Sequence, residues 1–298
     1  MQPHEINSLK EFMVVLEKLK LQFSHSAKEM DFSYRGVCNS SYPLLPGIYR
    51  EIILNESGIS GNAKLYCAHE YEILSHFIKE ASSYISNIQR DDYLLWMEYA
   101  QHFGVPTRLL DFTSNPLVAL YFCCKDKSET DGLVWVMNET NFCHWYRQSD
   151  FVIHNEPISK QQIINSMIAE MKGSFDYDPQ KIEMKRPVSY IPYYIDQRMI
   201  AQSSRFLIWG TDTRPLGEMI TENEYMVLSP EGIRYEKLYD TRFIFQFKIS
   251  SCYKYSILKQ LNICGINEKA LFPGLDGIGR YIADIYRTNT DDLLDMLF

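Results

Sequence analysis

The sequence predicts an α+β fold in which helices flank a central mixed or antiparallel sheet. Apolar residues recur at helical spacing in several segments. Between those segments lie short runs of β-branched and aromatic residues, bounded by turn signals. No internal repeat or low-complexity linker divides the sequence, which indicates one elaborated domain over residues 1–298.

The first elements are a helix, a strand and a second helix. Ser8 and Glu11 have the spacing of a capping box, which starts a helix. One face of that helix is apolar and contains Leu9, Phe12, Met13, Leu16 and Leu19. A strand ended by glycine follows at 32–36, and the prolines of the next loop exclude a central strand there. The helix predicted over 63–82 has an inward face made of Leu65, Tyr66, His69, Ile73, Phe77 and Ile78.

The middle of the chain is predicted to hold two more helices. One runs over 91–103 and is ended by Gly104. The other begins with Ser114 or Asn115 as N-cap and has Pro116 at its first helical position, where a missing N–H is harmless.

The second half of the chain begins with an Asp-Gly turn that leads into the strand LVWVM. Polar residues dominate 147–186, which we interpret as a peripheral insertion. Further strands are predicted at 205–209 and 243–249, and further helices at 255–261 and 279–286.

The composition favours an ordinary globular protein. The chain is 46% hydrophobic and 23% charged, and its 298 residues can bury a large core. The net charge is −8, and no Lys/Arg cluster supplies the basic face that phosphate neutralisation needs, so no extended nucleic-acid surface is expected. The start of the sequence does not have the pattern of a signal peptide, and no apolar stretch approaches the roughly 20 residues that span a bilayer. We therefore expect a cytoplasmic location and no membrane partner.

The cysteines do not predict a metal site or a disulfide framework. The chain has 7 cysteines, an odd number, and no Cys-x-x-Cys pair. Cys143, His144 and His154 do not have the spacing of metal ligands. Reduced and mostly buried thiols are expected, and no metal.

Four islands of polar and glycine-rich sequence stand out within apolar surroundings. They are FSYRG (32–36), QHFGVPTRLLDFTSNPLVALYF (101–122), RMIAQSSRF (198–206) and LFPGLDGIGRYI (271–282). The glycines of the fourth island do not have the spacing or the strand-then-helix setting of a nucleotide loop, so this island predicts a turn and a helix start.

Arg35 is the leading candidate for binding an anion. A guanidinium at the end of a strand beside glycine suits bidentate binding of phosphate or carboxylate. The helix that starts near Ser114 offers free N–H groups to the same anion if the two face each other. The alternatives stay open: Arg35 pairs with Asp111 for structure, and Thr113, Ser114 and Asn115 are simply natural N-cap residues.

Two further pairs have local explanations of their own. Glu98 and His102 lie four residues apart on one predicted helix, where a carboxylate that holds an imidazole would suit a general base. Alternatively, His102 caps or packs against the loop that follows. Arg108 and Asp111 straddle a predicted tight turn and are expected to hold that turn.

The islands together resemble the FRG domain, a bacterial family named for its Phe/Tyr-Arg-Gly motif, here Tyr34-Arg35-Gly36. The second island is similar to the family's stretch QH-aromatic-G-x-PTRLLD-aromatic-T-x-NP. The third resembles its Arg-Ile-x-x-Gln segment, and the fourth its FP-x-LDG turn. Where the family usually has Gln-x-Gly-x-Phe, this chain has Gln202-Ser-Ser204-Arg-Phe206, so a glycine is replaced by serine.

The resemblance implies a more distant likeness to the ADP-ribosyltransferase fold, and with it NAD as the substrate of transfer or hydrolysis. The residues implied in NAD binding are Tyr34, Arg35, Gly36, Arg108, Thr113, Ser114 and Asn115. Arg35 would hold the diphosphate or ribose, and Thr113 or Ser114 would orient the nicotinamide. Gln202 stands where a Glu usually stabilises the oxocarbenium-like transition state, so Glu98 or Asp111 would have to supply that charge, with His102 beside Glu98.

Two functions follow from this sequence. The first is an ADP-ribosyltransferase or NAD glycohydrolase with a protein as one candidate acceptor, acting as a toxin or effector in bacterial phage defence. The alternative is a non-enzymatic module that binds a nucleotide or small anionic ligand and serves as a sensor or interaction domain.

Overall fold

A seven-stranded mixed sheet forms the centre of the protein, in the order β1-β7-β4-β2-β3-β6-β5. This computed structural model describes residues 4–23, 31–53, 63–85, 88–150, 164–165, 167–168, 185–220 and 242–297. The strands are β1 (His4–Ile6), β2 (Phe32–Val37), β3 (Leu109–Thr113), β4 (Gly132–Asn138), β5 (Val188–Tyr190), β6 (Ser204–Ile208) and β7 (Ile244–Ile249). β1 and β7 are parallel and the other neighbouring strands are antiparallel. The predicted α+β fold with a mixed sheet is confirmed.

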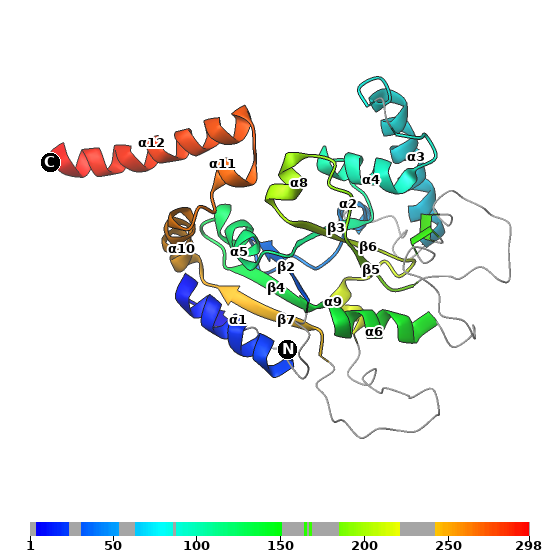
Figure 1. Ribbon diagram of the computed structural model, residues 1–298, viewed down its shortest axis with the longest axis horizontal. Coiled ribbons are helices and arrows are strands. Elements are labelled where there is room, and N and C mark those ends of the chain that lie inside the picture. The colour runs from blue at the N-terminus through cyan, green and yellow to red at the C-terminus, as the bar shows by residue number, and fades with distance from the viewer. Residues whose placement is uncertain are drawn as a thin grey trace.

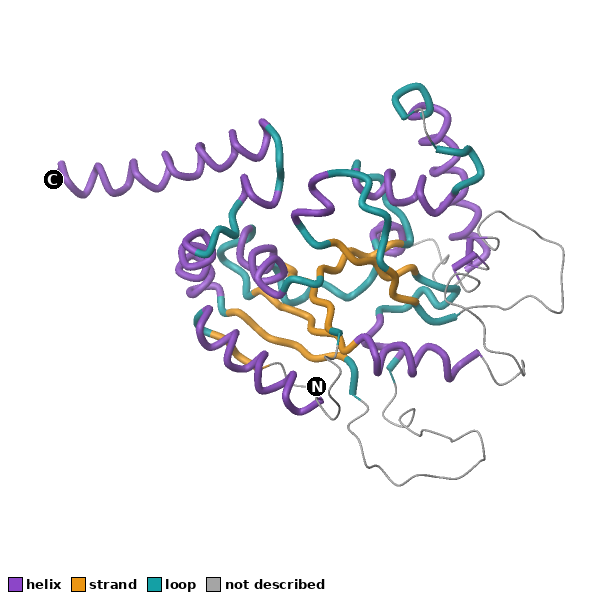
Figure 2. Tube along the Cα trace, viewed as in Figure 1, coloured by secondary structure: helices purple, strands orange, loops and turns teal. Residues whose placement is uncertain are grey.

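Helices cover both faces of this sheet (Figures 1 and 2). One face packs against α1 (Leu9–Phe23), α5 (Pro116–Lys125) and α10 (Ser251–Ile263). The other packs against α2 (Gly47–Ile53), α3 (Ala63–Ala81), α4 (Tyr93–His102), α6 (Glu139–Asp150) and α9 (Leu216–Met219). All of β4 is buried because it lies between these two layers.

Three helices lie at the rim of the sheet or beyond it. They are α8 (Gln197–Ala201), α11 (Glu268–Leu271) and α12 (Leu275–Leu297). Figure 1 shows α12 as a long helix that projects away from the sheet and carries the C-terminus. Among the described residues, no helix combines the length and apolar character needed to cross a membrane.

The sheet opens between β2 and β3. These strands share one register pair, Tyr34 with Thr113, whereas β2 pairs with β4 along its whole length. β3 likewise pairs with β6 from Leu109 to Thr113. Beyond Tyr34 the two strands therefore diverge, and the space between them is available to side chains and ligands.

The start of α5 and its packing on β2 follow from local sequence. The Asn115 side chain accepts a hydrogen bond from the Leu117 N–H at 3.0 Å, and Pro116 occupies the first turn, as predicted. α5 lies so close to β2 that a Cβ at Gly36 would be 1.8 Å from the Ala119 carbonyl oxygen. Gly36 is therefore required for this helix–strand packing.

Several details differ from the sequence-based predictions. The segment 109–113 is a strand and not a tight turn, because β6 supplies a partner for its backbone. Met13 and His69 are exposed, although both were expected on inward faces. On α3 the inward positions include Glu70, which is buried because it pairs with Arg108, the residue before β3. Most of the predicted insertion at 147–186 lies outside the described residues.

Candidate functional site

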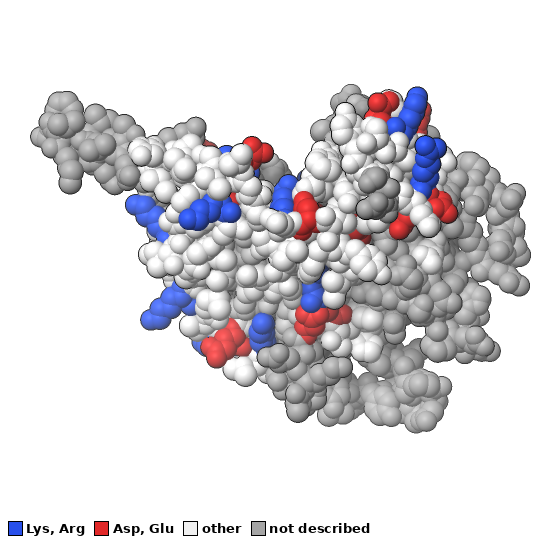
Figure 3. All heavy atoms as spheres, turned by 45° about the horizontal axis from the view of Figure 1, so that its top comes forward, with Lys and Arg blue, Asp and Glu red and all other residues white. Residues whose placement is uncertain are grey.

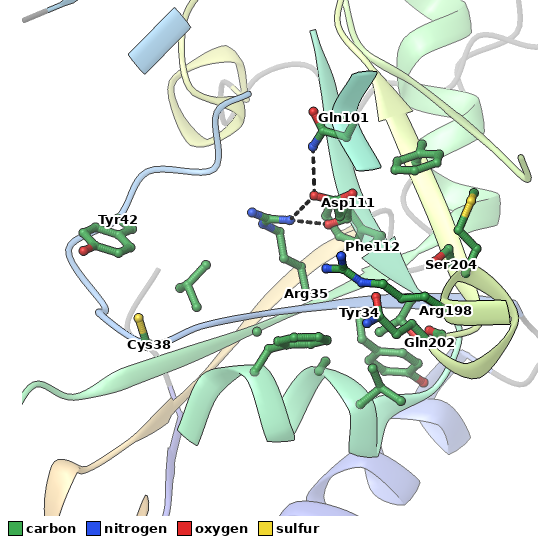
Figure 4. Close-up of a pocket in the computed structure, with 18 of the residues that line it drawn as sticks. Tyr34, Arg35, Cys38, Tyr42, Gln101, Asp111, Phe112, Arg198, Gln202 and Ser204 are labelled. Atoms are coloured by element: carbon green, nitrogen blue, oxygen red, sulfur yellow. Dashed lines mark hydrogen bonds and ion pairs between the residues drawn. The ribbon is translucent and has the colours of Figure 1, made fainter. Parts of the chain in front are cut away.

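A pocket of about 370 Å³ occupies the opening between β2 and β3 (Figure 4). Its walls come from β2 and the loop after it, from α2, α4, β3, α5 and α8, and from the start of β6. The second and third islands and the Tyr-Arg-Gly segment thus meet at one place. On the face shown in Figure 3, basic and acidic side chains are interspersed and do not gather into one charged field.

Arg35 bridges the opening between the strands. Its Nη1 donates to the Asp111 carbonyl oxygen at 2.5 Å. If β2 and β3 were paired along their whole length, a backbone N–H of β2 would donate there instead. The Asp111 carboxylate is 3.9 Å from the same nitrogen. Among the described residues, the Nε and Nη2 of Arg35 have no hydrogen-bond partner. Burial lowers the pKa of Arg35 to about 10, with Asp111 opposing the shift and Arg50 adding to it, so the guanidinium is charged at neutral pH.

Asp111 is held by its neighbour on α4. Gln101 Nε2 donates to Asp111 Oδ2 at 3.0 Å, and Thr107 Oγ1 donates to Gln101 Oε1 at 2.8 Å. This chain fixes which end of the Gln101 amide faces the carboxylate. The Asp111 side chain stays 56% exposed, so it remains accessible to a ligand in the pocket.

Two more arginines line the pocket, and the sequence analysis did not assign them. Arg50 of α2 donates one hydrogen bond, from Nε to the Leu45 carbonyl at 2.9 Å. Arg198 of α8 is half-buried and makes no hydrogen bond or ion pair with the described residues. Figure 4 shows Arg198 and Arg35 extending into the pocket from different elements. A signal for Arg198 was present in the third island, but nothing in the local sequence indicated that it would be left without a carboxylate.

The pocket lining is therefore basic within an acidic protein. Among the described residues of the lining, the charged groups are the three guanidinium groups of Arg35, Arg50 and Arg198 and the carboxylate of Asp111. Burial lowers the pKa of His102, which also lines the pocket, and this favours the neutral imidazole. The remaining lining includes aromatic rings from Tyr42, Phe112, Phe122 and Phe206. Unpaired guanidinium forks beside flat apolar surfaces suit an organic anion.

Tyr34 and Gly36 also line the pocket. Tyr34 is 1% exposed and its hydroxyl has no hydrogen-bond partner among the described residues. Burial is the main cause that raises the pKa of Tyr34, with the charge of Asp31 adding to it, so the phenol is neutral. Gly36 has a packing role that explains it without a ligand.

The start of α5 is not an open anion site, contrary to the hypothesis from sequence. The Thr113 hydroxyl lines the pocket but donates to the Gln202 carbonyl at 2.6 Å and accepts from the Asn115 N–H at 3.0 Å. Ser114 binds the Ser203 carbonyl through its backbone N–H at 3.0 Å, and Asn115 caps the helix itself. Neither Ser114 nor Asn115 lines the pocket. The hydrogen bonds of Thr113 and Ser114 join the end of β3 to the turn before β6, and the Asn115 side chain is used by the cap of α5.

The predicted Glu98–His102 pair does not form. Glu98 is 2% exposed and does not line the pocket, whereas His102 Nε2 lies 2.7 Å from Asp196 Oδ2. Burial raises the pKa of Glu98 to about 8. The nearby Tyr190 hydroxyl partly opposes this rise. Glu98 Oε2 and the Tyr190 hydroxyl do not, however, have normal hydrogen-bond geometry. His102 thus holds α4 against the N-cap of α8, and Glu98 is a neutral buried group.

Arg108 lies outside the pocket as well. Its side chain is 1% exposed, and its Nε donates to Glu70 Oε2 at 2.5 Å. Glu70 Oε1 also accepts from the Arg108 backbone N–H at 2.8 Å. The expected pairing of Arg108 with Asp111 across a turn is wrong, because the chain after Arg108 continues as the extended strand β3 and α3 provides the carboxylate that pairs with Arg108.

Gln202 lines the pocket but its amide is engaged. Nε2 donates to the Leu271 carbonyl oxygen at 3.0 Å. The next residue, Ser203, has a φ of 47°, so the left-handed backbone falls one position before the glycine that this chain lacks. Ser204 is buried at the start of β6 and lines the pocket. The serine in place of glycine therefore adds a side chain to the pocket without straining that residue.

Comparison with known protein families supports the resemblance seen in the sequence. Residues 30–132, about a third of the chain, match the family model of the FRG domain. The resemblance is confirmed over this range, which contains the first two islands, whereas the other two lie outside it. Neither a curated protein nor a solved structure matched the chain. Among the described residues, no group of three or more His, Cys, Asp or Glu side chains is arranged to hold a metal ion.

Proposed function

We propose that this protein, which carries an FRG domain over residues 30–132, binds a phosphate-bearing small molecule of the nucleotide class. The observation that carries the proposal is the group of three arginines that line one pocket with a single carboxylate between them. Arg35 and Arg198 are partly buried, whereas Arg50 is exposed, and a partly buried charge without a counter-charge is unfavourable. A dianionic ligand would supply the missing partners.

Phosphate fits a group of three arginines better than a simple carboxylate does, because it offers more acceptor oxygens and more negative charge. A guanidinium presents parallel N–H groups that match two phosphate oxygens, and Arg35 keeps two of its three nitrogens free for this purpose. The pocket volume of about 370 Å³ lies in the range of small-molecule sites. The aromatic rings of the lining would contact a base or a ribose.

Cleavage of NAD is the second candidate function, and Asp111 favours it. Asp111 is the one carboxylate that the described part of the chain contributes to the pocket lining, and it lies beside Arg35. When the N-glycosidic bond breaks, nicotinamide leaves with the bonding electrons and positive charge develops on the ribose. The Asp111 carboxylate would stabilise that charge, and water or an acceptor nucleophile would then add to the ribose carbon and lose a proton.

The other groups suggested for this role suit it less. Gln202 offers no negative charge, and its amide already donates to the Leu271 carbonyl oxygen. Glu98 is buried away from the pocket and its raised pKa favours the neutral form. NAD as substrate, a protein acceptor and a role as toxin or effector in phage defence belong to this second candidate, whereas a cytoplasmic location is proposed with either one. A sensor or interaction module corresponds to the first.

Calorimetric titration with AMP, ADP, ADP-ribose and NAD tests the binding proposal. We expect saturable binding of at least one of these nucleotides, with inorganic phosphate competing at higher concentration. Arg205→Gln is a suitable control, because Arg205 pairs with Asp31 and does not line the pocket. Absence of binding to all four compounds at millimolar concentration would overturn the proposal. Nicotinamide release from saturating NAD then separates the two candidates.

A further inference from the structure

The segment from Glu268 to Phe272, which we call the bracket, lies against the pocket. It consists of α11 and of Phe272, which follows that helix directly, and its last two residues begin the fourth island. Three cations lie over the Phe272 ring: Lys125 Nζ at 4.6 Å, Arg198 Cζ at 4.7 Å and Arg280 Cζ at 5.1 Å from its centroid. Of these three, Arg198 lines the pocket.

The other two cations both pair with Glu268 of α11, four residues before Phe272. Glu268 Oε2 lies 2.6 Å from Lys125 Nζ, and Oε1 accepts from Arg280 Nε at 2.5 Å. The Tyr121 hydroxyl also donates to Glu268 at 2.5 Å. This buried carboxylate therefore fixes the bracket to α5, whereas Arg198 has no carboxylate partner within the part of the chain that the structure describes.

The same bracket is joined to α8. Gln202 Nε2 donates to the Leu271 carbonyl oxygen, one residue before Phe272. The Phe272 ring also meets the ring of Phe122, a pocket residue on α5, edge to face at 6.1 Å. Two walls of the pocket, α5 and α8, are thus both fixed to the segment from Glu268 to Phe272.

We propose that Arg198 is a ligand-binding residue of the pocket and that Phe272 is the residue that positions it. The ring covers one face of the guanidinium, which leaves the N–H edges free for phosphate oxygens. Because the side chain is already restrained, less conformational entropy is lost when the ligand binds. This inference rests on the proposed nucleotide-binding function and extends it to a part of the chain outside the FRG match.

The ligand class follows from the placement of the arginines. Arg35 enters from β2 and Arg198 from α8, so a phosphate group between them would be contacted from both walls (Figure 4). With Arg50 included, guanidinium groups from β2, α2 and α8 line the pocket, and a diphosphate presents two phosphoryl groups to them where a monophosphate presents one. The structure therefore assigns the pocket to a diphosphate-containing nucleotide.

A double-mutant cycle tests the inference. Affinities for ADP-ribose and for AMP are measured by calorimetry for wild type, Arg198→Gln, Phe272→Leu and the double variant. We expect Arg198→Gln to weaken ADP-ribose binding about tenfold or more, and AMP binding less. Phe272→Leu should weaken ADP-ribose binding about threefold to tenfold, and Phe272→Tyr, which keeps the aromatic face, should restore it. In the Arg198→Gln background, Phe272→Leu should have no further effect, because its influence passes through Arg198.

The outcomes separate the inference from the function beneath it. If wild type binds none of the nucleotides, the proposed function fails. If wild type binds ADP-ribose and Arg198→Gln binds it equally well, only the role of Arg198 fails. An equal loss from Phe272→Leu in both backgrounds would show that Phe272 acts on the fold and not through Arg198. Thermal melting checks each variant, and Arg198→Lys, which keeps the charge but loses the planar fork, replaces Arg198→Gln if the latter does not fold.

Discussion

Two clusters of arginine and carboxylate are attached to β3, and they differ in what they leave available. In the closed cluster, Arg108 and Glu70 are 1% and 2% exposed, and Glu70 accepts both the side-chain and backbone donors of Arg108. In the open cluster, Arg35 donates to a backbone carbonyl while the Asp111 side chain is 56% exposed. The closed cluster uses its charges to join α3 to β3. The open cluster keeps donors and an acceptor free, which is the requirement for a ligand site.

The difference shows why an arginine in a distinctive motif is not by itself a ligand. Arg35 and Arg108 both belong to segments that resemble the FRG family, and both were expected to bind the nucleotide. Only Arg35 lines the pocket. Arg108 is paired with Glu70, which lies on a helix far from it in the sequence, and so it does not reach the pocket. Arg35 lines the pocket because β2 and β3 diverge beside it.

Breaking the closed cluster should have the largest effect. Glu70→Ala removes the carboxylate that pairs with the buried Arg108 guanidinium, so we expect the free energy of unfolding to fall by about 3–5 kcal/mol. Urea denaturation followed by circular dichroism measures this. The matched change in the open cluster, Asp111→Ala, should lower stability by less than about 1 kcal/mol because the carboxylate is exposed. Equal losses for the two variants would remove the distinction between the clusters.

The next effect is on binding. Arg35→Lys keeps the positive charge but loses the planar fork, so nucleotide affinity should fall by about 1–3 kcal/mol with little change in melting temperature. Calorimetric titration gives the affinity and differential scanning calorimetry gives the melting temperature. If affinity stays the same while the melting temperature falls, Arg35 belongs with Arg108 as a structural residue.

Asp111→Asn sharpens the contrast between binding and catalysis within the open cluster. The amide can still accept from Gln101 but carries no charge, so anion affinity should rise by about 0.2–1 kcal/mol. If the pocket cleaves NAD, nicotinamide release should fall sharply in the same variant, because the stabilising charge is lost. Undiminished turnover in Asp111→Asn would exclude Asp111 as the stabilising group. If the wild type binds nucleotide but releases no nicotinamide, only the binding function stands.

Glu98, a buried polar group outside both clusters, provides a test that depends on pH. Its pKa in the folded protein is about 8, above the ordinary value of 4.5, so the folded state holds a proton that the unfolded state has lost between these two values. Wild-type stability should therefore decline as pH rises through that window and level off above about 8. Glu98→Gln, which cannot titrate, should resemble wild type near pH 5 and exceed it near pH 8. The exposed Glu72, changed to Gln, should leave the slope of stability against pH as in wild type.

Local signals in the sequence predicted many of the elements well. The N-cap and proline at the start of α5, the Asp-Gly turn before β4 and the strand-forming runs of β6 and β7 lie where they were expected. Each depends on residues a few positions apart, which constrain the backbone whatever the rest of the chain does. The strand at 109–113 was missed because a neighbouring strand, far along the chain, is what makes it a strand.

The sequence by itself determined the α+β class, the main helices and strands, the FRG resemblance over its first two islands and the place of Arg35 at the end of a strand. Only the tertiary structure decided which of the polar and charged side chains bind one another or the backbone. Glu70 reaches Arg108 across 38 residues, and Gln202 reaches the Leu271 carbonyl across 69. Spacing in a sequence describes which side chains share a helix face or a strand face, but contacts across such separations depend on how those faces pack against one another. For this reason the free guanidinium of Arg198 became visible only when α8, α11 and the opening between β2 and β3 were seen together.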